Sequence, residues 1–188
     1  MAQVDVIFPG YVREGGQRVG GTVSLVRDGN ATIIIDPGLV PNRSAILDPL
    51  IELGVLPELV TDVIFSHHHP DHTLHAALFP MAKFHDYWAI YKGDYWHSRP
   101  AEGYRLSPDV RLMETPGHTP QDITTIVETP QGVDAFTHLW WNEDGPPEDP
   151  LATSSEGLHA GRERVLAVAE WVVPGHGPMF RVGPKTQR

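Results

Sequence analysis

Residues 66–72 read Ser-His-His-His-Pro-Asp-His, which places four of the chain's eleven histidines and one aspartate within seven positions. A short apolar run precedes them, so the histidines stand at the end of a predicted strand. His67 and His69 are two residues apart and therefore face the same side of the strand, whereas His68 faces the other side. The pattern predicts that His67 and His69 point toward one place.

The second half of this stretch adds two more metal-ligating side chains. Pro70 is suited to the first turn of a helix, and that helix would bring Asp71 and His72 to the same place from another direction. Histidine and aspartate are common ligands of divalent cations, and a purely structural role for so many of them at this spacing is rare. The stretch therefore predicts a metal site.

Two further histidines, His118 and His176, occupy settings of the same kind. Each follows a predicted strand and lies in a Pro-Gly turn, TPGHTP at 115–120 and VPGHGP at 173–178. Glycine lets the backbone turn sharply, so both side chains can project from strand ends toward one edge of a sheet. Neither turn is specific alone, but together with the first stretch they form a convergent set of ligands.

The composition limits both the fold and the chemistry of the metal site. A chain of 188 residues with 40% hydrophobic content suits one globular domain, 1–188, and its 18 glycines and 18 prolines favour short strands in a mixed α and β architecture. The chain has no cysteine, so only nitrogen and oxygen ligands are available for a metal.

The net charge and the apolar pattern bear on partners and location. A formal charge of −10 repels polyanions, so an extended nucleic-acid groove is disfavoured, although a local one is not. The N-terminus has no basic region followed by an apolar one, and no apolar run approaches the roughly 20 residues that cross a bilayer. These features predict a cytoplasmic protein without a membrane segment.

The periodicity of apolar residues predicts the order of the elements. Strands are expected over 4–8, 22–27, 31–35, 61–65, 82–85, 110–114, 123–128, 133–138 and 171–173, and helices over 43–53, 74–79 and 155–170. Residues 86–109 have no clear period and are interpreted as a long loop, which in a compact domain is often functional. The acidic segment 142–150 is interpreted as a solvated loop.

The signature His-x-His-x-Asp-His at 67–72, with a later Gly-His at His118 and a final Gly-His at His176, resembles the metallo-β-lactamase superfamily. The resemblance covers nearly the whole chain, and segments 115–122 and 164–182 look especially like the subgroup of metallo-β-lactamase domain-containing protein 1. It implies an αββα sandwich of two mixed sheets flanked by helices, with one or two metals at one edge. The expected metal is Zn²⁺, with Mn²⁺ or Fe as alternatives.

The resemblance also implies two ligand sets. The first site would consist of His67, His69 and His118. The second site would consist of Asp71, His72 and His176.

One position departs from the family pattern. Binuclear members carry an aspartate after a strand that bridges both metals, and His138 occupies the corresponding position here. A neutral imidazole can ligate only one cation, so His138 ligates one metal while water bridges the pair, or the second metal is weak, or only one metal binds. Asp134 lies four residues earlier, about 13 Å along a regular strand, and cannot easily substitute.

These features together predict a metal-dependent hydrolase. A metal-bound hydroxide would attack a small ester, lactone or phosphodiester, and Asp71 would orient the hydroxide or shuttle its proton to the leaving group. The alternatives are an RNA or DNA endonuclease or a phosphodiesterase, an iron-dependent dioxygenase, and a non-catalytic metal-binding protein. The expected partner is a small-molecule substrate.

Aromatic and remaining histidine residues carry weaker predictions. One group of aromatic side chains would line an apolar pocket, or lie in the core or at a homodimer interface. That group consists of Tyr87, Trp88, Tyr91, Tyr95, Trp96, Trp140 and Trp141. The histidines without motif support are treated as structural, and they are His75, His85, His97 and His159.

Overall fold

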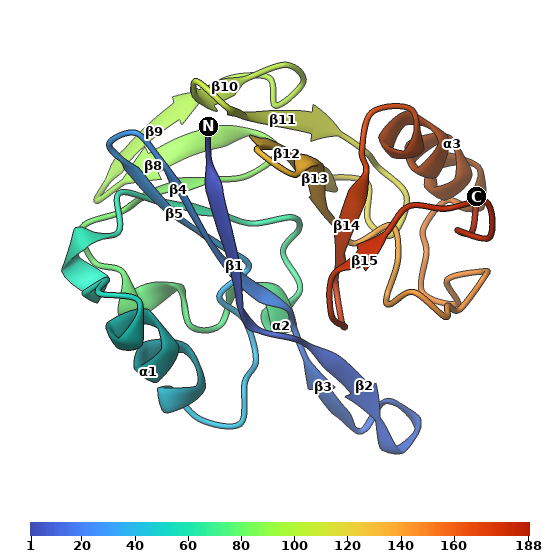
Figure 1. Ribbon diagram of the computed structural model, residues 1–188, viewed down its shortest axis with the longest axis horizontal. Coiled ribbons are helices and arrows are strands. Elements are labelled where there is room, and N and C mark those ends of the chain that lie inside the picture. The colour runs from blue at the N-terminus through green and yellow to red at the C-terminus, as the bar shows by residue number, and fades with distance from the viewer.

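Two β-sheets packed face to face form the centre of the molecule in the computed structural model, which describes residues 1–188 (Figure 1). The first sheet has the strand order β1 (Gln3–Phe8), β4 (Val23–Asp28), β5 (Ala31–Ile35), β6 (Asp62–Ile64), β7 (Lys83–His85), β8 (Ala89–Lys92) and β9 (Tyr95–Ser98). The second has the order β10 (Arg105–Ser107), β11 (Val110–Glu114), β12 (Ile123–Thr129), β13 (Gly132–Thr137), β14 (Trp171–Pro174) and β15 (Phe180–Arg181).

Both sheets are mixed, because each contains parallel and antiparallel neighbours. In the first sheet β5, β6 and β7 are parallel, and the outer pairs are antiparallel. In the second sheet only β13 and β14 are parallel. A parallel pair brings the carboxyl ends of both strands to the same edge, and this edge carries the histidines discussed below.

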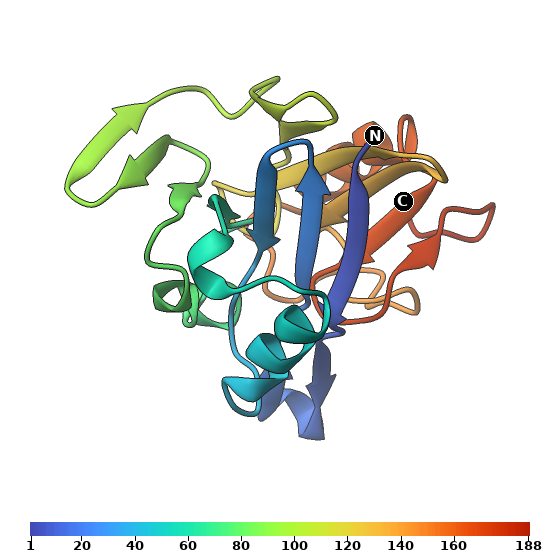
Figure 2. The same cartoon turned by 60° about the vertical axis from the view of Figure 1, so that its left-hand side comes forward.

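Helices cover the outer faces of the two sheets. The helix α1 (Ser44–Glu52) lies against the first sheet and α3 (Ser155–Leu166) against the second, and Figure 2 shows α1 in front of the blue strands with the yellow and orange strands behind. The remaining helical segments are α2 (Pro70–Thr73), η1 (Glu14–Gly16), η2 (Pro57–Leu59) and η3 (Ala76–Leu78). No helix is long and apolar enough to span a membrane.

Three apolar clusters fill the three interfaces between these four layers. In β5, Ile33 and Ile35 belong to the cluster between the sheets, while Ile34 belongs to the cluster beneath α1. In β13, Phe136 faces the interior between the sheets and Ala135 faces the cluster beneath α3. This alternation follows from the two-residue period of a strand that is buried on both faces. The αββα sandwich predicted from the sequence is therefore confirmed.

Several predicted elements agree closely with the structure. The strands predicted at 31–35 and 110–114 have those bounds, and the turn between β4 and β5 places Gly29 at a φ of 59°. The helix predicted over 43–53 is α1, and Gly54 after it has a φ of 74°, which glycine adopts without strain.

Other predictions were wrong, and each for a local reason. Residues 86–109 are not a structureless loop, because they contain β8, β9 and β10. All four residues of β9 are exposed, so the strand has no buried face that could produce an alternating pattern. The helix predicted over 74–79 is only the single turn η3, since the helical segment starts earlier, at Pro70. The helix predicted over 155–170 ends at Leu166.

A third, two-stranded sheet was not predicted. It pairs β2 (Tyr11–Arg13) with β3 (Arg18–Gly20) and forms a hairpin that projects from the sandwich near α2 (Figure 1). Val12 and Val19 are directly opposite each other across this hairpin. The strands are only three residues long, which is too short for a periodic signal.

Candidate metal centre

The seven side chains predicted as metal ligands lie together at one edge of the sandwich. They are His67, His69, Asp71, His72, His118, His138 and His176. His67 follows β6, His138 directly follows β13, and His176 follows β14. The register of the parallel pair β13 and β14 places Thr137 beside Pro174, so the next residues of both strands emerge at the same edge.

Three histidines form the first group. The Nε2 atom of His67 and the Nε2 atom of His118 each lie 3.0 Å from Nδ1 of His69. Nitrogens bound tetrahedrally to a zinc ion at about 2.0 Å would be roughly 3.3 Å apart. The three nitrogens are therefore close to the spacing that one cation requires.

Asp71, His72 and His176 form the second group. The Oδ2 atom of Asp71 lies 3.4 Å from Nε2 of His72 and 3.5 Å from Nε2 of His176. The backbone carbonyl of Asp71 accepts a hydrogen bond from the Leu39 amide at 3.0 Å. A Cβ on Gly38 would lie 1.7 Å from that carbonyl oxygen, so only glycine permits this approach.

Four of the histidines have their other ring nitrogen fixed by a neighbouring acceptor. The Nδ1 atoms lie close to Ser66 Oγ for His67 (3.0 Å), Asp36 Oδ2 for His72 (3.0 Å), Asp149 Oδ2 for His118 (2.6 Å) and the Gly20 carbonyl for His176 (3.0 Å). Ser66 Oγ itself donates to Asp36 Oδ2 at 2.6 Å, so it accepts from His67. These contacts place a proton on each Nδ1 and direct the Nε2 atoms into the centre.

His138 lies between the two groups. Its ring centroid is 4.0 Å from that of His118 and 4.6 Å from that of His67, and its Nε2 atom is 3.0 Å from Nε2 of His176. Its Nδ1 atom is buried without a hydrogen-bond partner. Gly175 packs against the ring, and a Cβ there would lie 2.5 Å from Cδ2 of His138. The ring is thus held where both groups can be reached.

Burial and mutual repulsion determine the protonation of the centre. Burial, reinforced by the positive charges of neighbouring histidines, lowers the pKa of His67 and of His138 well below 6.5. The same two causes, burial and the charge of His72, lower the pKa of His176 to about 4. These three rings are neutral near pH 7 and have a free lone pair.

The two charged members of the second group behave differently. Burial would raise the pKa of Asp71, but the hydrogen bond and the charge of His72 outweigh it and lower the pKa to about 2. For His72 burial alone would lower the pKa, but the carboxylates of Asp36 and Asp71 outweigh burial and raise the pKa to about 9. The ionised carboxylates therefore favour a positive charge at this place, supplied by a proton or a cation.

Two residues in contact with the histidines were missed by the sequence prediction. Asp36 follows β5 within Asp36-Pro37-Gly38, and its position after a strand is the signal that could have identified it. Asp149 belongs to the acidic segment that we predicted to be solvated. That prediction is wrong for Asp149, which is only 7% exposed, and it holds for Glu143, Asp144 and Glu148, which are exposed.

His68 faces away from the centre, as predicted. Its Nε2 atom lies 2.9 Å from Oδ2 of Asp86, and its ring stacks on Trp88. Two other histidines that we treated as structural make local contacts. His75 donates from Nδ1 to the Gly38 carbonyl at 2.6 Å, and Nε2 of His85 lies 2.8 Å from Asp62.

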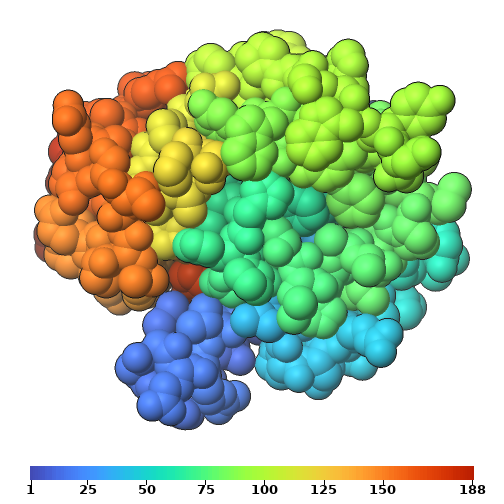
Figure 3. Space-filling model, turned by 180° about the vertical axis from the view of Figure 1, so that it is seen from behind, coloured from blue at the N-terminus to red at the C-terminus, as the bar shows by residue number.

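A cavity of about 820 Å³ opens over the centre. One side is formed by the hairpin residues 12–16 and 19, and the other by Trp141, Pro150 and Leu151. In Figure 3 a hollow lies between the blue hairpin, the orange segment and the green segment, with red atoms at its base. Of the seven aromatic residues predicted to line a pocket, Trp141 is the one that lines this cavity. Trp140 belongs to the core, and Tyr95 and Trp96 are exposed on β9.

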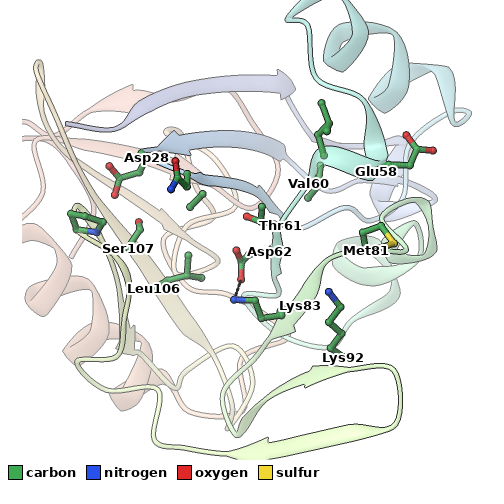
Figure 4. A pocket seen from close by; sticks show the side chains of 15 residues that line it. Asp28, Glu58, Val60, Thr61, Asp62, Met81, Lys83, Lys92, Leu106 and Ser107 are labelled. Atoms are coloured by element: carbon green, nitrogen blue, oxygen red, sulfur yellow. Dashed lines mark ion pairs between the residues drawn. The ribbon is translucent and has the colours of Figure 1, made fainter.

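A second cavity, of about 730 Å³, lies at the amino-terminal ends of β5 and β6, away from the histidines (Figure 4). Charged side chains of both signs surround it, among them Asp28, Asp62, Lys83 and Lys92, and Lys83 pairs with Asp62 at 3.5 Å. All four groups of three or more metal-ligating side chains lie at the other edge. The chemistry of the molecule is therefore concentrated at the histidine cluster.

Residues 16–180 match the metallo-beta-lactamase superfamily. Metallo-beta-lactamase domain-containing protein 1 of Xenopus laevis is 33% identical over 190 residues, which cover 95% of this chain and 81% of that protein. The Homo sapiens protein of the same name is 35% identical over 180 residues, covering 90% of this chain and 67% of that protein.

Solved structures show the same fold at low sequence identity. One from Thermotoga maritima has a TM-score of 0.75 at 20% identity, and the alignment covers 96% of this chain and 99% of that one. A quorum-quenching N-acyl homoserine lactone lactonase has a TM-score of 0.67 at 18% identity, covering 93% and 91%. These likenesses concern the arrangement of the backbone.

Proposed function

The chain belongs to the metallo-beta-lactamase superfamily, and from this membership we propose that it is a metal-dependent hydrolase of a small ester, lactone or phosphodiester. The observation that carries the proposal is the convergence of six histidines and Asp71 at one edge of the sandwich, beneath an open cavity. Fold alone does not determine a reaction, so the proposal rests on the donor atoms of this site as well as on family membership.

The donor set fits divalent cations. The Nε2 atom of His72 is buried, and its nearest acceptor is Oδ2 of Asp71 at 3.4 Å, which is longer than a normal hydrogen bond, although buried polar atoms are normally well hydrogen-bonded. Nitrogen and carboxylate donors suit Zn²⁺, and they also accept Mn²⁺ and Fe²⁺. His67, His69 and His118 would hold one cation, and Asp71, His72 and His176 would hold the other. Such cations lower the pKa of water and polarise a carbonyl or phosphoryl oxygen.

We assign His138 to the ligands as well. Its Nε2 atom lies 3.0 Å from Nε2 of His176, and burial keeps the ring neutral, so this nitrogen can offer a lone pair to a cation of the second group. One imidazole nitrogen ligates one cation, whereas a carboxylate offers an oxygen to each of two. The second cation would therefore be held less firmly than in a centre with a bridging aspartate.

Asp71 would contribute to the reaction beyond holding a cation. Its side chain is 18% exposed, and it lines the cavity in which the substrate would lie. The low pKa keeps the carboxylate ionised, so it can accept a hydrogen bond from the attacking water and orient it. The alternative role is that of a proton shuttle, in which Asp71 passes a proton from this water to the leaving group.

The cavity walls favour a neutral substrate. Val12, Val19, Leu39, Trp141 and Leu151 are apolar, and Arg13 is the only lysine or arginine among the lining residues. A molecule with a charge of −10 attracts an extended polyanion poorly. We therefore favour an ester or lactone over a nucleic acid. RNA binding that weakens steeply with salt would instead support the nuclease alternative.

The test combines metal content with activity toward a panel of esters, lactones and phosphodiesters. Wild-type protein should contain one or two equivalents of zinc per chain by elemental analysis. His67→Ala and His118→Ala should lose both metal and activity, because each removes a donor of the first group. His97, exposed on β9, provides the matched control, and His97→Ala should leave both unchanged. Full activity in verified metal-free protein would refute the proposal.

The same experiment separates the other two alternatives. An iron-dependent dioxygenase requires iron, so full activity in an iron-free preparation would exclude it. A metal-loaded protein that is inert on the whole panel would favour a non-catalytic metal-binding role.

Location and assembly complete the proposal. We propose a cytoplasmic protein that acts on a small molecule, alone or as a homodimer. Fluorescence imaging of the tagged chain and light scattering in solution would test these two statements.

A further inference from the structure

In the acidic segment 142–150, which precedes α3, one carboxylate is buried in the protein. Of its four acidic residues, Asp149 alone is buried, and only 1% of its side chain is exposed. A carboxylate that loses its hydration is unfavourable unless hydrogen bonds or an opposite charge compensate it. The contacts of Asp149 therefore indicate what holds it in this position.

Both carboxylate oxygens of Asp149 are hydrogen-bonded, and neither contacts a lysine or an arginine. The Oδ2 atom lies 2.6 Å from Nδ1 of His118, and Oδ1 accepts a hydrogen bond from the Leu151 amide at 2.9 Å. The only ion-pair partner of Asp149 is His118, which is itself 2% exposed. The buried carboxylate is thus directed at one histidine.

The two ring nitrogens of His118 have different partners. Nδ1 donates to Asp149, while Nε2 lies 3.0 Å from Nδ1 of His69 in the first group. An acceptor at Nδ1 fixes the tautomer, the ring orientation and the basicity of the other nitrogen. In the first group His67 has a neutral hydroxyl at its Nδ1, and Asp36 is reached only through that hydroxyl. Asp149 is therefore the carboxylate that directly contacts a histidine of this group.

The backbone around Asp149 supports the same histidine. The Thr153 amide donates to the carbonyl of His118 at 3.1 Å, and the Ser154 amide donates to the carbonyl of Gly117 at 3.0 Å. From the other side, Arg162 donates to the carbonyl of Pro147 at 2.7 Å. Hydrogen bonds therefore hold the backbone on both sides of Asp149, and they keep its side chain beside the ring of His118.

We propose that Asp149 is a positioning residue for the first metal group, acting through His118 without touching the substrate. Because the neighbouring Pro150 and Leu151 line the cavity, the same side chain also fixes part of the substrate-binding wall. The inference rests on the proposed metal centre, and its test must separate the two.

The test measures zinc affinity of the full chain by competition with a chelator. Loss of an acceptor behind a ligating histidine typically lowers metal affinity by 10- to 100-fold. Asp149→Ala should therefore raise the dissociation constant of the first zinc by about 10- to 100-fold. Asp149→Asn should fall between this variant and wild type, since the amide oxygen can still accept from Nδ1. The matched control is Asp144→Asn, at an exposed acid of the same segment, which should bind zinc like wild type.

A second measurement covers the case in which the variants fold poorly. In the zinc-loaded wild-type protein, nitrogen-15 NMR of the His118 ring should show a protonated Nδ1 and a proton-free Nε2. The opposite tautomer would overturn the inference without any variant. At saturating zinc, activity lost in Asp149→Asn should largely return, which a merely structural defect would not allow.

The outcomes distinguish the two proposals. Wild-type protein that binds none of Zn²⁺, Mn²⁺ and Fe²⁺ would refute the metal centre itself, and with it the role of Asp149 that rests on it. Zinc binding that is firm in wild type and equal in Asp149→Ala and Asp144→Asn would leave the centre intact and refute the role of Asp149.

Discussion

Asp134 should lower the stability of the fold at neutral pH, and replacing it should raise that stability. The residue lies in β13, it is 3% exposed, and its Oδ1 atom is buried without a hydrogen-bond partner. Burial, together with the negative charge of Glu170, raises its pKa from 3.8 to about 6. The folded state therefore prefers the protonated carboxyl more strongly than the unfolded chain does.

The sign and the size of the effect of Asp134 on the free energy of unfolding follow from this difference in pKa. Below about pH 4 the carboxyl is protonated in both states and its ionisation has no cost. Between about pH 4 and pH 6 the unfolded chain releases the proton first, so stability falls as pH rises. At about 1.4 kcal/mol per pKa unit, a shift of about two units corresponds to about 3 kcal/mol above pH 6. Asp134→Asn removes this pH-dependent loss, although its buried amide adds a cost that is independent of pH.

The assay is urea unfolding of wild type and Asp134→Asn between pH 4.5 and 7.5. The free energy of unfolding of Asp134→Asn minus that of wild type should increase as pH rises. This difference should reach a plateau above about pH 6. Glu128→Gln, at an exposed acid of the neighbouring strand β12, should show no such trend. A difference between Asp134→Asn and wild type that is the same at every pH would refute the reasoning.

Two further predictions concern His138. Gly175→Ala should reduce metal retention, because the new Cβ would lie 2.5 Å from Cδ2 of His138 and force the ring to move. Elemental analysis would measure the loss. The control is Gly183→Ala, because nothing lies within 4 Å of a Cβ at that position. His138→Asp should retain more of a second metal equivalent after mild chelation, because a carboxylate can bridge two cations; equal loading in both proteins would contradict the proposed weakness of the second position.

The sequence was sufficient to predict which side chains would meet, because each of the proposed ligands is marked locally. His67, His118 and His176 all follow a strand, and the two later ones sit in Pro-Gly turns, so their meeting at one sheet edge could be expected. Asp134 was correctly set aside as a substitute bridge. In the register of β13 it pairs with Trp171, three positions before the Thr137–Pro174 pair at the edge, and it belongs to none of the metal-ligating groups.

The partners of these ligands could not be predicted because they come from distant parts of the chain. Asp149 is 31 residues from His118, and the Gly20 carbonyl is 156 residues from His176. Asp36 is 36 residues from His72. A local pattern contains no information about such contacts until the sheets are packed. An acidic segment rich in proline then has the same composition whether one of its carboxylates is buried or all of them are solvated.

The contacts of the carboxylates also bear on how many cations the centre can hold. Three carboxylates contact its histidines, namely Asp36 and Asp71 at His72 and Asp149 at His118. Two divalent cations bring four positive charges, and each uncompensated charge in a buried site is costly because the local dielectric is low. An aspartate at position 138 would have supplied a fourth carboxylate. The neutral ring of His138 supplies a donor without charge. In the proposed centre one cation would therefore be well compensated, and a second would rely on water for the remaining compensation.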